Sequence, residues 1–375
     1  MAIRLEIENY RCIRSARWDL EGVCALVGPN GSGKSTLLGA LQFLTNLINR
    51  GPLNAAEWAG PGPHKNVSAS RDDRIRFTFS DGPTAWEVSP VEQGANFIMP
   101  MRELLIHDGS PVVEQETGDS QFAVKGNKAF RATGDRSAVG LAAAALPEVM
   151  DVHRPMVERI ASYRLLRDVP YYELRTVGAP DRSSWVLDEH GLNLFTLLRN
   201  WQTNRSFRAS YDFVMEGLKG AFAEVFEDLD FEMAGRSVYA RFYSPRVKDP
   251  FPIALAPTGM LQGICVLAAV ASSPHDGIVA IDDFEIGLHP FAIERLIAHI
   301  REWSEDHGTK VILTTHSPVV LDRFNGQQEQ VFVTDPAEST FPVRLTEHRN
   351  RDWLERFGLG DLYARQEFGA QRPVQ

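Results

Sequence analysis

Cysteines and long apolar runs are both scarce in this chain. Its 375 residues include three cysteines, Cys12, Cys24 and Cys265, whose wide spacing indicates neither a metal cluster nor a disulfide framework. No apolar run approaches the roughly 20 residues that cross a bilayer. Residues 3–9 alternate apolar and polar side chains, which predicts a strand at the start of the chain rather than a signal peptide. These features favour a protein of the reducing cytoplasm that has no membrane partner.

Positive charge is also in short supply. Lysine and arginine number 39 against 49 acidic residues, so the net charge is -10, which argues against a surface built for non-specific nucleic-acid binding. The chain also lacks internal repeats, low-complexity segments and a sustained heptad pattern, so a long coiled coil is not expected. Three local arginine groups remain, and a solvated or ion-paired face is the simpler interpretation of each. They are Arg11, Arg14 and Arg17, then Arg71, Arg74 and Arg76, then Arg199, Arg205 and Arg208.

One glycine-rich stretch carries a complete motif. Gly28-Pro29-Asn30-Gly31-Ser32-Gly33-Lys34-Ser35-Thr36 fits the P-loop pattern G-x-x-x-x-G-K-[ST] without a mismatch. Residues 23–27 before it predict a buried strand, and residues 37–48 after it predict a helix with one apolar face. A strand that enters such a turn and leaves it as a helix directs backbone N–H groups and the positive helix end at one point, which suits phosphate. The motif therefore predicts a site for ATP and Mg²⁺.

Each residue of the motif has an expected part in that site. Lys34 would neutralise the β- and γ-phosphates, and the Ser35 hydroxyl would bind Mg²⁺. The other residues expected to line the phosphates are Asn30, Gly31, Ser32, Gly33 and Thr36.

Composition changes along the chain suggest four segments. Gly51-Pro52, together with Gly60-Pro61-Gly62-Pro63, predicts a loop after the first helix, and residues 74–88 predict a β-hairpin. From about 91 to 140 we expect short strands and polar loops. The segments are 1–50, the N-terminal part of an ATPase head with the P-loop; 51–140, a β-rich lobe with loops; 141–250, a mainly helical insertion; and 251–375, the C-terminal part of the head.

The last third returns to alternating strands and helices. Residues 278–281 and 311–313 are wholly apolar, and residues 261–271 and 291–305 predict a buried and an amphipathic helix. Apolar strands between helices indicate a mostly parallel sheet that is covered on both faces. The predicted fold class is therefore α/β, a P-loop NTPase with a mixed or parallel sheet and an inserted subdomain of helices and antiparallel strands.

Candidate partners for the P-loop follow the two apolar strands of this last third. Asp282 comes directly after one strand and would hold Mg²⁺, through water or together with Ser35. Asp283 could polarise the attacking water, and Glu285 is a third carboxylate close by. His316 follows the second strand and would contact the γ-phosphate. We therefore expect all four side chains near the P-loop.

Several stretches together resemble a known family. They look like the ABC-type ATPase heads of the SMC, RecF and OLD-nuclease lineage, above all the AAA/ABC-type ATPases of bacterial defence and toxin–antitoxin operons. The resemblance implies a homodimer in which ATP lies between the P-loop of one head and the signature loop of the other. The stretches are Asn9-Tyr10-Arg11, Gly28 to Thr36, Asp188 to Leu198, Ile281 to Pro290 and Leu313 to Pro318.

The same resemblance points to a signature loop at residues 256–262. Thr258 and Gly259 would contact the nucleotide of the partner copy, and Arg11 matches a position that can reach the nucleotide of its own chain. Pro257 stands where the family has a serine, and Asp283 stands where it has a catalytic glutamate. Both departures predict slow hydrolysis with nucleotide binding retained.

The leading hypothesis is an ATP-binding, slowly hydrolysing ATPase that serves as the sensor or regulator of a multi-protein system. The residues after His316 carry no acidic cluster of the kind that a TOPRIM nuclease needs. We therefore expect a separate effector, a nuclease or toxin from the same operon, in antiphage defence or a toxin–antitoxin pair. One alternative is a RecF-like DNA-repair ATPase that clamps DNA, so a nucleic-acid partner stays open. The other is a scaffold that binds ATP without turnover.

Overall fold

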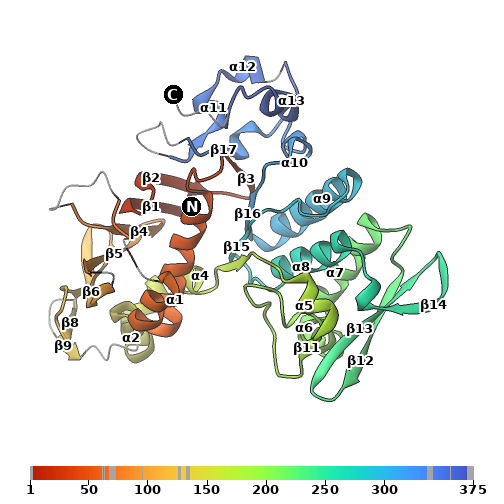
Figure 1. The fold of residues 1–375 in the computed structure, drawn as a ribbon. Helices are drawn as coiled ribbons and strands as arrows, with labels where there is room; N and C mark the ends of the chain where they lie inside the picture. The colour runs from red at the N-terminus through yellow and green to blue at the C-terminus, as the bar shows by residue number, and fades with distance from the viewer. Residues whose placement is uncertain are drawn as a thin grey trace.

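Three β-sheets with surrounding helices make up the described part of the computed structural model (Figure 1). The structure describes residues 3–60, 62, 64–66, 73–94, 96–125, 128–131, 136–335, 341–354 and 356–369. Pro61 and Pro63 of the predicted loop and Arg71 of the second arginine group lie outside these residues. In the view of Figure 1 the β-rich lobe lies to the left, the later part of the insertion from α5 to β14 to the right and the C-terminal helices at the top.

A six-stranded sheet forms the centre of the fold. Its neighbouring strands run parallel, apart from the last one, which is antiparallel. The strands in order are β10 (Arg164–Leu166), β15 (Ile278–Ile281), β16 (Lys310–Thr314), β3 (Val23–Val27), β17 (Val331–Val333) and β18 (Val343–Arg344). This arrangement confirms the predicted α/β class and the mostly parallel sheet.

Helices cover both faces of the central sheet. The side chains of β3 alternate between two hydrophobic cores, with Val23, Ala25 and Val27 in one and Cys24 and Leu26 in the other. Because a strand points successive side chains to opposite faces, each core marks one covered face. The main helices of the head are α1 (Lys34–Ala59), α8 (Thr258–Ala271) and α9 (Pro290–His307).

The strand β10 was not predicted. It lies within the segment expected to be a mainly helical insertion, yet it pairs with β15 at the edge of the central sheet. A strand of three residues is too short for a periodic pattern to show. Its pairing carries Arg167 and Asp168 to the carboxyl ends of the parallel strands.

An eight-stranded antiparallel sheet forms the β-rich lobe. The predicted hairpin is present, but the prediction of short strands after residue 91 is wrong for β6, which has 12 residues. Pro100 lies inside this strand and interrupts its pattern, since proline usually marks a strand edge or end. The strands in sequence are β1 (Ile3–Tyr10), β2 (Ile13–Leu20), β4 (Arg76–Asp81), β5 (Thr84–Gln93), β6 (Asn96–His107), β7 (Ser110–Gln115), β8 (Gln121–Val124) and β9 (Lys128–Arg131).

The predicted loop at Gly51-Pro52 is wrong as well. The first helix continues past these residues to Ala59, with a kink at Gly51, where φ is 82° and ψ is 174°. Glycine tolerates this backbone conformation, and Pro52 can start the second helical piece because the N–H that it lacks would be unbonded in a first turn.

The remaining elements build the insertion and the C-terminal part. The predicted helices and strands of the insertion appear as α6, α7, β12 and β13. Within the described residues, no helix is both long and apolar enough to span a bilayer. The insertion holds α2 (Ala138–Ala145), α3 (Pro147–Met150), α4 (Arg154–Ala161), α5 (Tyr171–Thr176), α6 (Leu194–Thr203), α7 (Arg208–Ala221), β11 (Ala179–Pro180), β12 (Asp228–Ala234), β13 (Ser237–Ser244) and β14 (Val247–Pro252). The C-terminal helices are α10 (Pro318–Asp322), α11 (Leu345–His348), α12 (Arg351–Leu354) and α13 (Leu359–Ala364).

A buried carboxylate joins the β-rich lobe to α2. Glu103 of β6 accepts hydrogen bonds from the backbone N–H groups of Ala138, at 2.9 Å, and Val139, at 3.3 Å. Burial raises the pKa of Glu103 from 4.5 to about 7, although the two backbone bonds favour the charged form. The folded chain therefore binds this proton more tightly than the unfolded chain does.

The raised pKa of Glu103 predicts a pH-dependent stability. The stabilisation of the folded chain by protonated Glu103 is fully present below about pH 4.5 and is lost as the pH rises towards 7. The free energy of unfolding changes by up to about 3 kcal/mol over this range. Glu103→Gln should therefore raise the free energy of unfolding relative to wild type more at pH 8 than at pH 5. Denaturant unfolding at the two pH values measures this difference, with Glu114→Gln, on an exposed position of β7, as the control. If Glu103→Gln changes the free energy of unfolding equally at both pH values, the pKa of Glu103 is not raised in the folded chain.

Candidate functional site

The P-loop links β3 to α1 in a conformation that demands glycine. Gly31 and Gly33 have φ values of 77° and 100°, in the left-handed region that other residues rarely adopt. A β-carbon on Gly33 would lie 3.1 Å from the Phe341 ring and 3.2 Å from the Cys12 sulfur. The glycines thus allow both the turn and the close packing around it.

Lys34 is folded back into this loop. Its Nζ donates to the backbone oxygens of Gly28, at 2.9 Å, and Pro29, at 3.1 Å. Burial lowers the pKa of Lys34, and the nearby carboxylates of Asp282 and Asp283 act in the opposite direction. A buried ammonium held by carbonyl oxygens places a positive charge where the motif predicts phosphate.

Asp282 meets the P-loop as predicted. The Ser35 hydroxyl donates to one of its carboxylate oxygens at 2.9 Å, across 247 residues of sequence. The Thr314 hydroxyl, at the end of β16, donates to the other carboxylate oxygen at 2.5 Å. Hydroxyl and carboxylate oxygens are the ligands that Mg²⁺ prefers, so Ser35 and Asp282 fit a Mg²⁺ ion that also binds phosphate oxygens and water.

Asp283 lies beside this pair in an unusual backbone conformation. Its φ is 51°, and its N–H donates to the Thr314 hydroxyl at 2.8 Å. Burial is the largest cause that raises the pKa of Asp283, and the adjacent Asp282 adds to it, while His316 and Lys34 lower it. The carboxyl group is therefore a stronger base than an ordinary aspartate.

The side chain of Glu285 contacts the backbone of His316 and not its ring. The N–H of His316 donates to Oε1 of Glu285 at 2.7 Å, which gives Glu285 a role in holding the loop after β16. Nδ1 of His316 lies 3.3 Å from the hydroxyl oxygen of Tyr363 in α13. Burial lowers the pKa of His316, and Lys34 adds to this effect, so the ring is neutral near pH 7.

The predicted signature segment, residues 256–262, includes the start of α8, which begins at Thr258 and not after the segment, and it packs against the loop that follows Asp282. A β-carbon on Gly259 would lie 2.2 Å from the backbone oxygen of Gly287, so glycine is required for this contact. The guanidinium of Arg175 in α5 donates to the Ala256 oxygen at 2.8 Å and to the Thr258 hydroxyl at 2.9 Å. The loop is thereby fixed from two sides within one chain.

Arg11 is placed next to the P-loop, and its side chain forms a hydrogen bond elsewhere. Its guanidinium donates to the Ala59 oxygen at 2.6 Å and lies 5.2 Å from the centre of the Tyr10 ring. The neighbouring Cys12 sulfur lies 3.4 Å from the Thr36 hydroxyl oxygen. A role of Arg11 in nucleotide binding stays a prediction.

Arg167, a charged residue near the site, was not predicted from the sequence. Arg167 follows β10, and its Nε donates to Glu189 at 2.5 Å while its guanidinium lies 5.4 Å from the Trp58 ring centre. The preceding Leu166 accepts a hydrogen bond from the N–H of Asp282 at 2.9 Å, which places Arg167 beside the site. Because β10 has no recognisable pattern, nothing in the sequence drew attention to Arg167.

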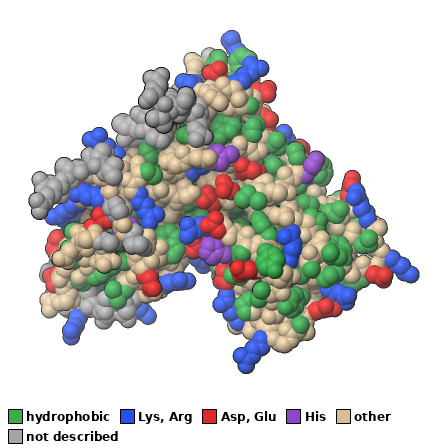
Figure 2. All heavy atoms as spheres, in the orientation of Figure 1, with side chains coloured by type: hydrophobic (Ala, Val, Ile, Leu, Met, Phe, Trp, Pro, Cys, Tyr) green, Lys and Arg blue, Asp and Glu red, His purple; other side chains and the backbone are tan. Residues whose placement is uncertain are grey.

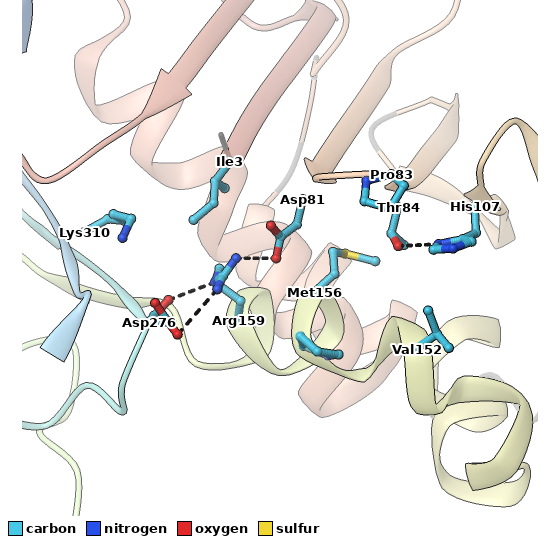
Figure 3. A pocket seen from close by; sticks show the side chains of 11 residues that line it. Ile3, Asp81, Pro83, Thr84, His107, Val152, Met156, Arg159, Asp276 and Lys310 are labelled. Atoms are coloured by element: carbon cyan, nitrogen blue, oxygen red, sulfur yellow. Dashed lines mark hydrogen bonds and ion pairs between the residues drawn. The ribbon is translucent and has the colours of Figure 1, made fainter. Parts of the chain in front are cut away.

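A further cavity, of about 400 Å³, lies on another part of the molecule (Figure 3). Arg159 of α4 forms ion pairs there with Asp81 and Asp276, and Lys310 lines the same cavity. The charge of Arg159 is thus balanced within the fold, and no residue of the P-loop lines this cavity.

Four of the eight described arginines in the three arginine groups form ion pairs with acidic side chains. Figure 2 shows basic and acidic side chains interspersed over the outer parts of this face, with acidic and histidine side chains together near its middle. This distribution favours the ion-paired interpretation over a nucleic-acid surface. The pairs are Arg17 with Glu6, Arg76 with Glu8 and Glu87, Arg199 with Asp181, and Arg208 with Asp212.

Comparisons with known proteins bear on both halves of the site. Residues 1–80 match a family model described as "AAA ATPase domain", and residues 148–322 match one described as "AAA domain, putative AbiEii toxin, Type IV TA system". No match was found among curated proteins.

Three solved structures of SMC heads are also similar, each at 12% identity. One is the SMC head bound to the C-winged helix domain of ScpA, with 93% of this chain and 99% of that chain covered and a TM-score of 0.48. The second is the SMC head domain from Thermotoga maritima, with 91% and 98% covered and a TM-score of 0.43. The third is the SMC head domain with an extended coiled coil bound to the C-terminal domain of ScpA derived from Pyrococcus furiosus, with 95% and 98% covered and a TM-score of 0.47.

The matched segments contain the residues that the fold brings together. The first includes the P-loop with Lys34 and Ser35, and the second includes Asp282, the signature loop and His316. Both models describe AAA-type ATPase domains, in agreement with the predicted P-loop ATPase.

Proposed function

We propose that the chain binds ATP with Mg²⁺ at the P-loop and hydrolyses it slowly as a dimer. The observation that carries this proposal is the 2.9 Å hydrogen bond between Ser35 and Asp282, at the side of the buried Lys34. A bound Mg²⁺ would neutralise charge on the phosphate oxygens. Lys34 would add a second positive charge, and the backbone N–H groups of the loop would orient the phosphates.

Asp283 would act as the base that activates water. Its raised pKa gives its carboxylate more basicity than an ordinary aspartate has, which suits proton abstraction. Its side chain is one methylene shorter than the glutamate that the family resemblance implies, and its N–H is tied to Thr314. The shorter side chain of Asp283 would reach the attacking water less well, and this would explain the slow turnover that we propose.

The signature loop would complete the site of a second copy. Exposed apolar side chains flank this loop and the loop after Asp282: Leu255 is 70% exposed, Ile286 44% and Phe291 49%. Apolar groups gathered on a surface commonly mark an interaction site. Their place beside Thr258 and Gly259 supports a dimer that closes around ATP.

The biological setting would be a system with a separate effector. The description of the family model over residues 148–322 names an AbiEii toxin and a type IV toxin–antitoxin system, which supports an antiphage or toxin–antitoxin role. In this setting the chain acts in the cytoplasm as sensor or regulator, and a nuclease or toxin from the same operon is the effector. Affinity purification from the native host tests this setting, because the proposal requires a co-purifying protein encoded beside this chain.

A second candidate function is an ATP-dependent scaffold that does not turn over. Pro257, which has neither a hydroxyl nor an N–H, and the short Asp283 favour it. The two functions are separated by steady-state hydrolysis, since a scaffold would hydrolyse ATP no faster than a variant that cannot bind it.

Lys34→Ala should strongly weaken nucleotide binding, because the phosphates lose their main positive counter-charge. A charge-assisted contact of this kind contributes about 1.5–3 kcal/mol, so ATP affinity should fall by about 10- to 100-fold. Calorimetric titration with ATP and Mg²⁺ measures it, and Lys219→Ala, at an exposed position of α7, is the matched control. Equal affinities of wild type and Lys34→Ala would contradict the assignment of the phosphate site.

Asp283→Ala should keep ATP binding and lower hydrolysis by about 100-fold, with a longer-lived ATP-bound dimer. Because the base works only when ionised, wild-type activity should fall as the pH drops through the raised pKa of Asp283, and the variant should lose this acid limb. Phosphate release from pH 4 to 8 measures both effects. Asp306→Ala, at an exposed position of α9, is the control. Wild-type hydrolysis by Asp283→Ala would instead make Glu285 the candidate base.

Arg175→Ala should weaken the dimer without weakening the first binding of ATP. The substitution releases the Ala256 oxygen and the Thr258 hydroxyl, so the signature loop loses one of its two supports. Sedimentation with ATP in the Asp283→Ala background should show more monomer, while ATP affinity stays within about twofold. Arg208→Ala, whose guanidinium pairs with Asp212 on the surface, serves as the control. If Arg175→Ala dimerises like the parent variant, Arg175 does not support the dimer contact.

A further inference from the structure

The C-terminal helix α13 is held closely against α10, the short helix that follows His316. The N–H of Gly360 donates to Asp322 at 2.9 Å, and the N–H of Leu359 donates to Asn325 at 2.9 Å. A β-carbon on Gly360 would lie 2.4 Å from the backbone oxygen of Pro318, so the two helices approach as nearly as glycine allows. This contact fixes α13 relative to the loop that carries His316.

The segment after α13 reaches the P-loop itself. A cavity of about 220 Å³ is lined by Asn30 of the P-loop, by His316, and by Tyr363 and Gln366 of the C-terminal segment. A β-carbon on Gly369 would lie 3.5 Å from the Cα of Gly28. The C-terminal segment therefore forms one wall of the space beside the expected phosphate site.

Tyr363 is the residue of this wall that touches His316. Burial, with the Glu285 carboxylate adding to it, raises the pKa of Tyr363, so the hydroxyl keeps its proton. The His316 ring is neutral because burial and Lys34 lower its pKa, and a neutral imidazole has one nitrogen that donates and one that accepts. The 3.3 Å contact joins the hydroxyl to Nδ1.

We propose that Tyr363 donates its hydroxyl proton in a hydrogen bond to Nδ1 of His316 and so keeps the ring proton on Nε2. The inference rests on the proposed function, in which His316 meets the γ-phosphate. With Nδ1 occupied as an acceptor, Nε2–H is the donor that a phosphate oxygen can accept. Tyr363 is thus a positioning residue: it sets the tautomer and the orientation of His316 without contacting the nucleotide.

The test uses Tyr363→Phe, which removes the hydroxyl and keeps the ring that packs near Phe368. Ring ¹⁵N chemical shifts of histidine-labelled full-length chain report which nitrogen carries the proton, and a His316→Gln variant identifies the signals. Wild type should show His316 protonated on Nε2, and Tyr363→Phe should move the signals towards the Nδ1–H form. The control is Tyr243→Phe, whose hydroxyl donates to Asp230 on the surface at 2.8 Å and should leave His316 unchanged.

Kinetics supply a second readout. Tyr363→Phe should lower kcat by roughly 10-fold and leave KM for ATP within about twofold, since orientation and not binding is disturbed. His316 signals that are the same in wild type and Tyr363→Phe, or a wild-type ring protonated on Nδ1, would overturn the inference. The ring signals are recorded without nucleotide, so they support or overturn the tautomer assignment even if the chain hydrolyses no ATP.

Discussion

The rest of the site depends on the hydrogen bonds that fix the carboxylate of Asp282. One of its oxygens accepts from Ser35 at the start of α1, and the other accepts from Thr314 at the end of β16. Its own N–H is bound to Leu166 at the end of β10. Three strands and the P-loop helix are therefore aligned by one residue. Because parallel strands end at the same edge, the fold can gather residues that are 247 positions apart.

The loop that follows Asp282 connects this residue to two other parts of the fold. Glu285 holds the backbone of His316, and Gly287 packs against Gly259 of the signature loop. A shift at Asp283 on nucleotide binding would therefore reach Gly259, which we propose contacts the nucleotide of a partner copy. In this account binding, hydrolysis and dimerisation are coupled through one short loop, and the C-terminal segment joins it through His316.

The sequence predicted the parts of the site that have local signatures. The P-loop, Asp282 after an apolar strand and His316 after the next strand all lie where their patterns indicated. Thr314 and Tyr363 could not be predicted, because hydroxyl groups at a strand end or in a short helix follow no pattern and gain their role from tertiary contacts. The strand β10 is too short to recognise, so Arg167 was overlooked with it. The extension of α1 past Gly51 was missed because a glycine–proline pair more often ends a helix than kinks it.

The composite site is the central claim, and mixing two inactive variants tests it most directly. Lys34→Ala removes the P-loop charge, and Thr258→Glu places a negative charge in the signature loop. A heterodimer of the two contains one intact composite site and one doubly damaged site. Random mixing should then restore about one quarter of wild-type hydrolysis. A mixture no more active than the two variants measured separately would contradict a site shared between two copies.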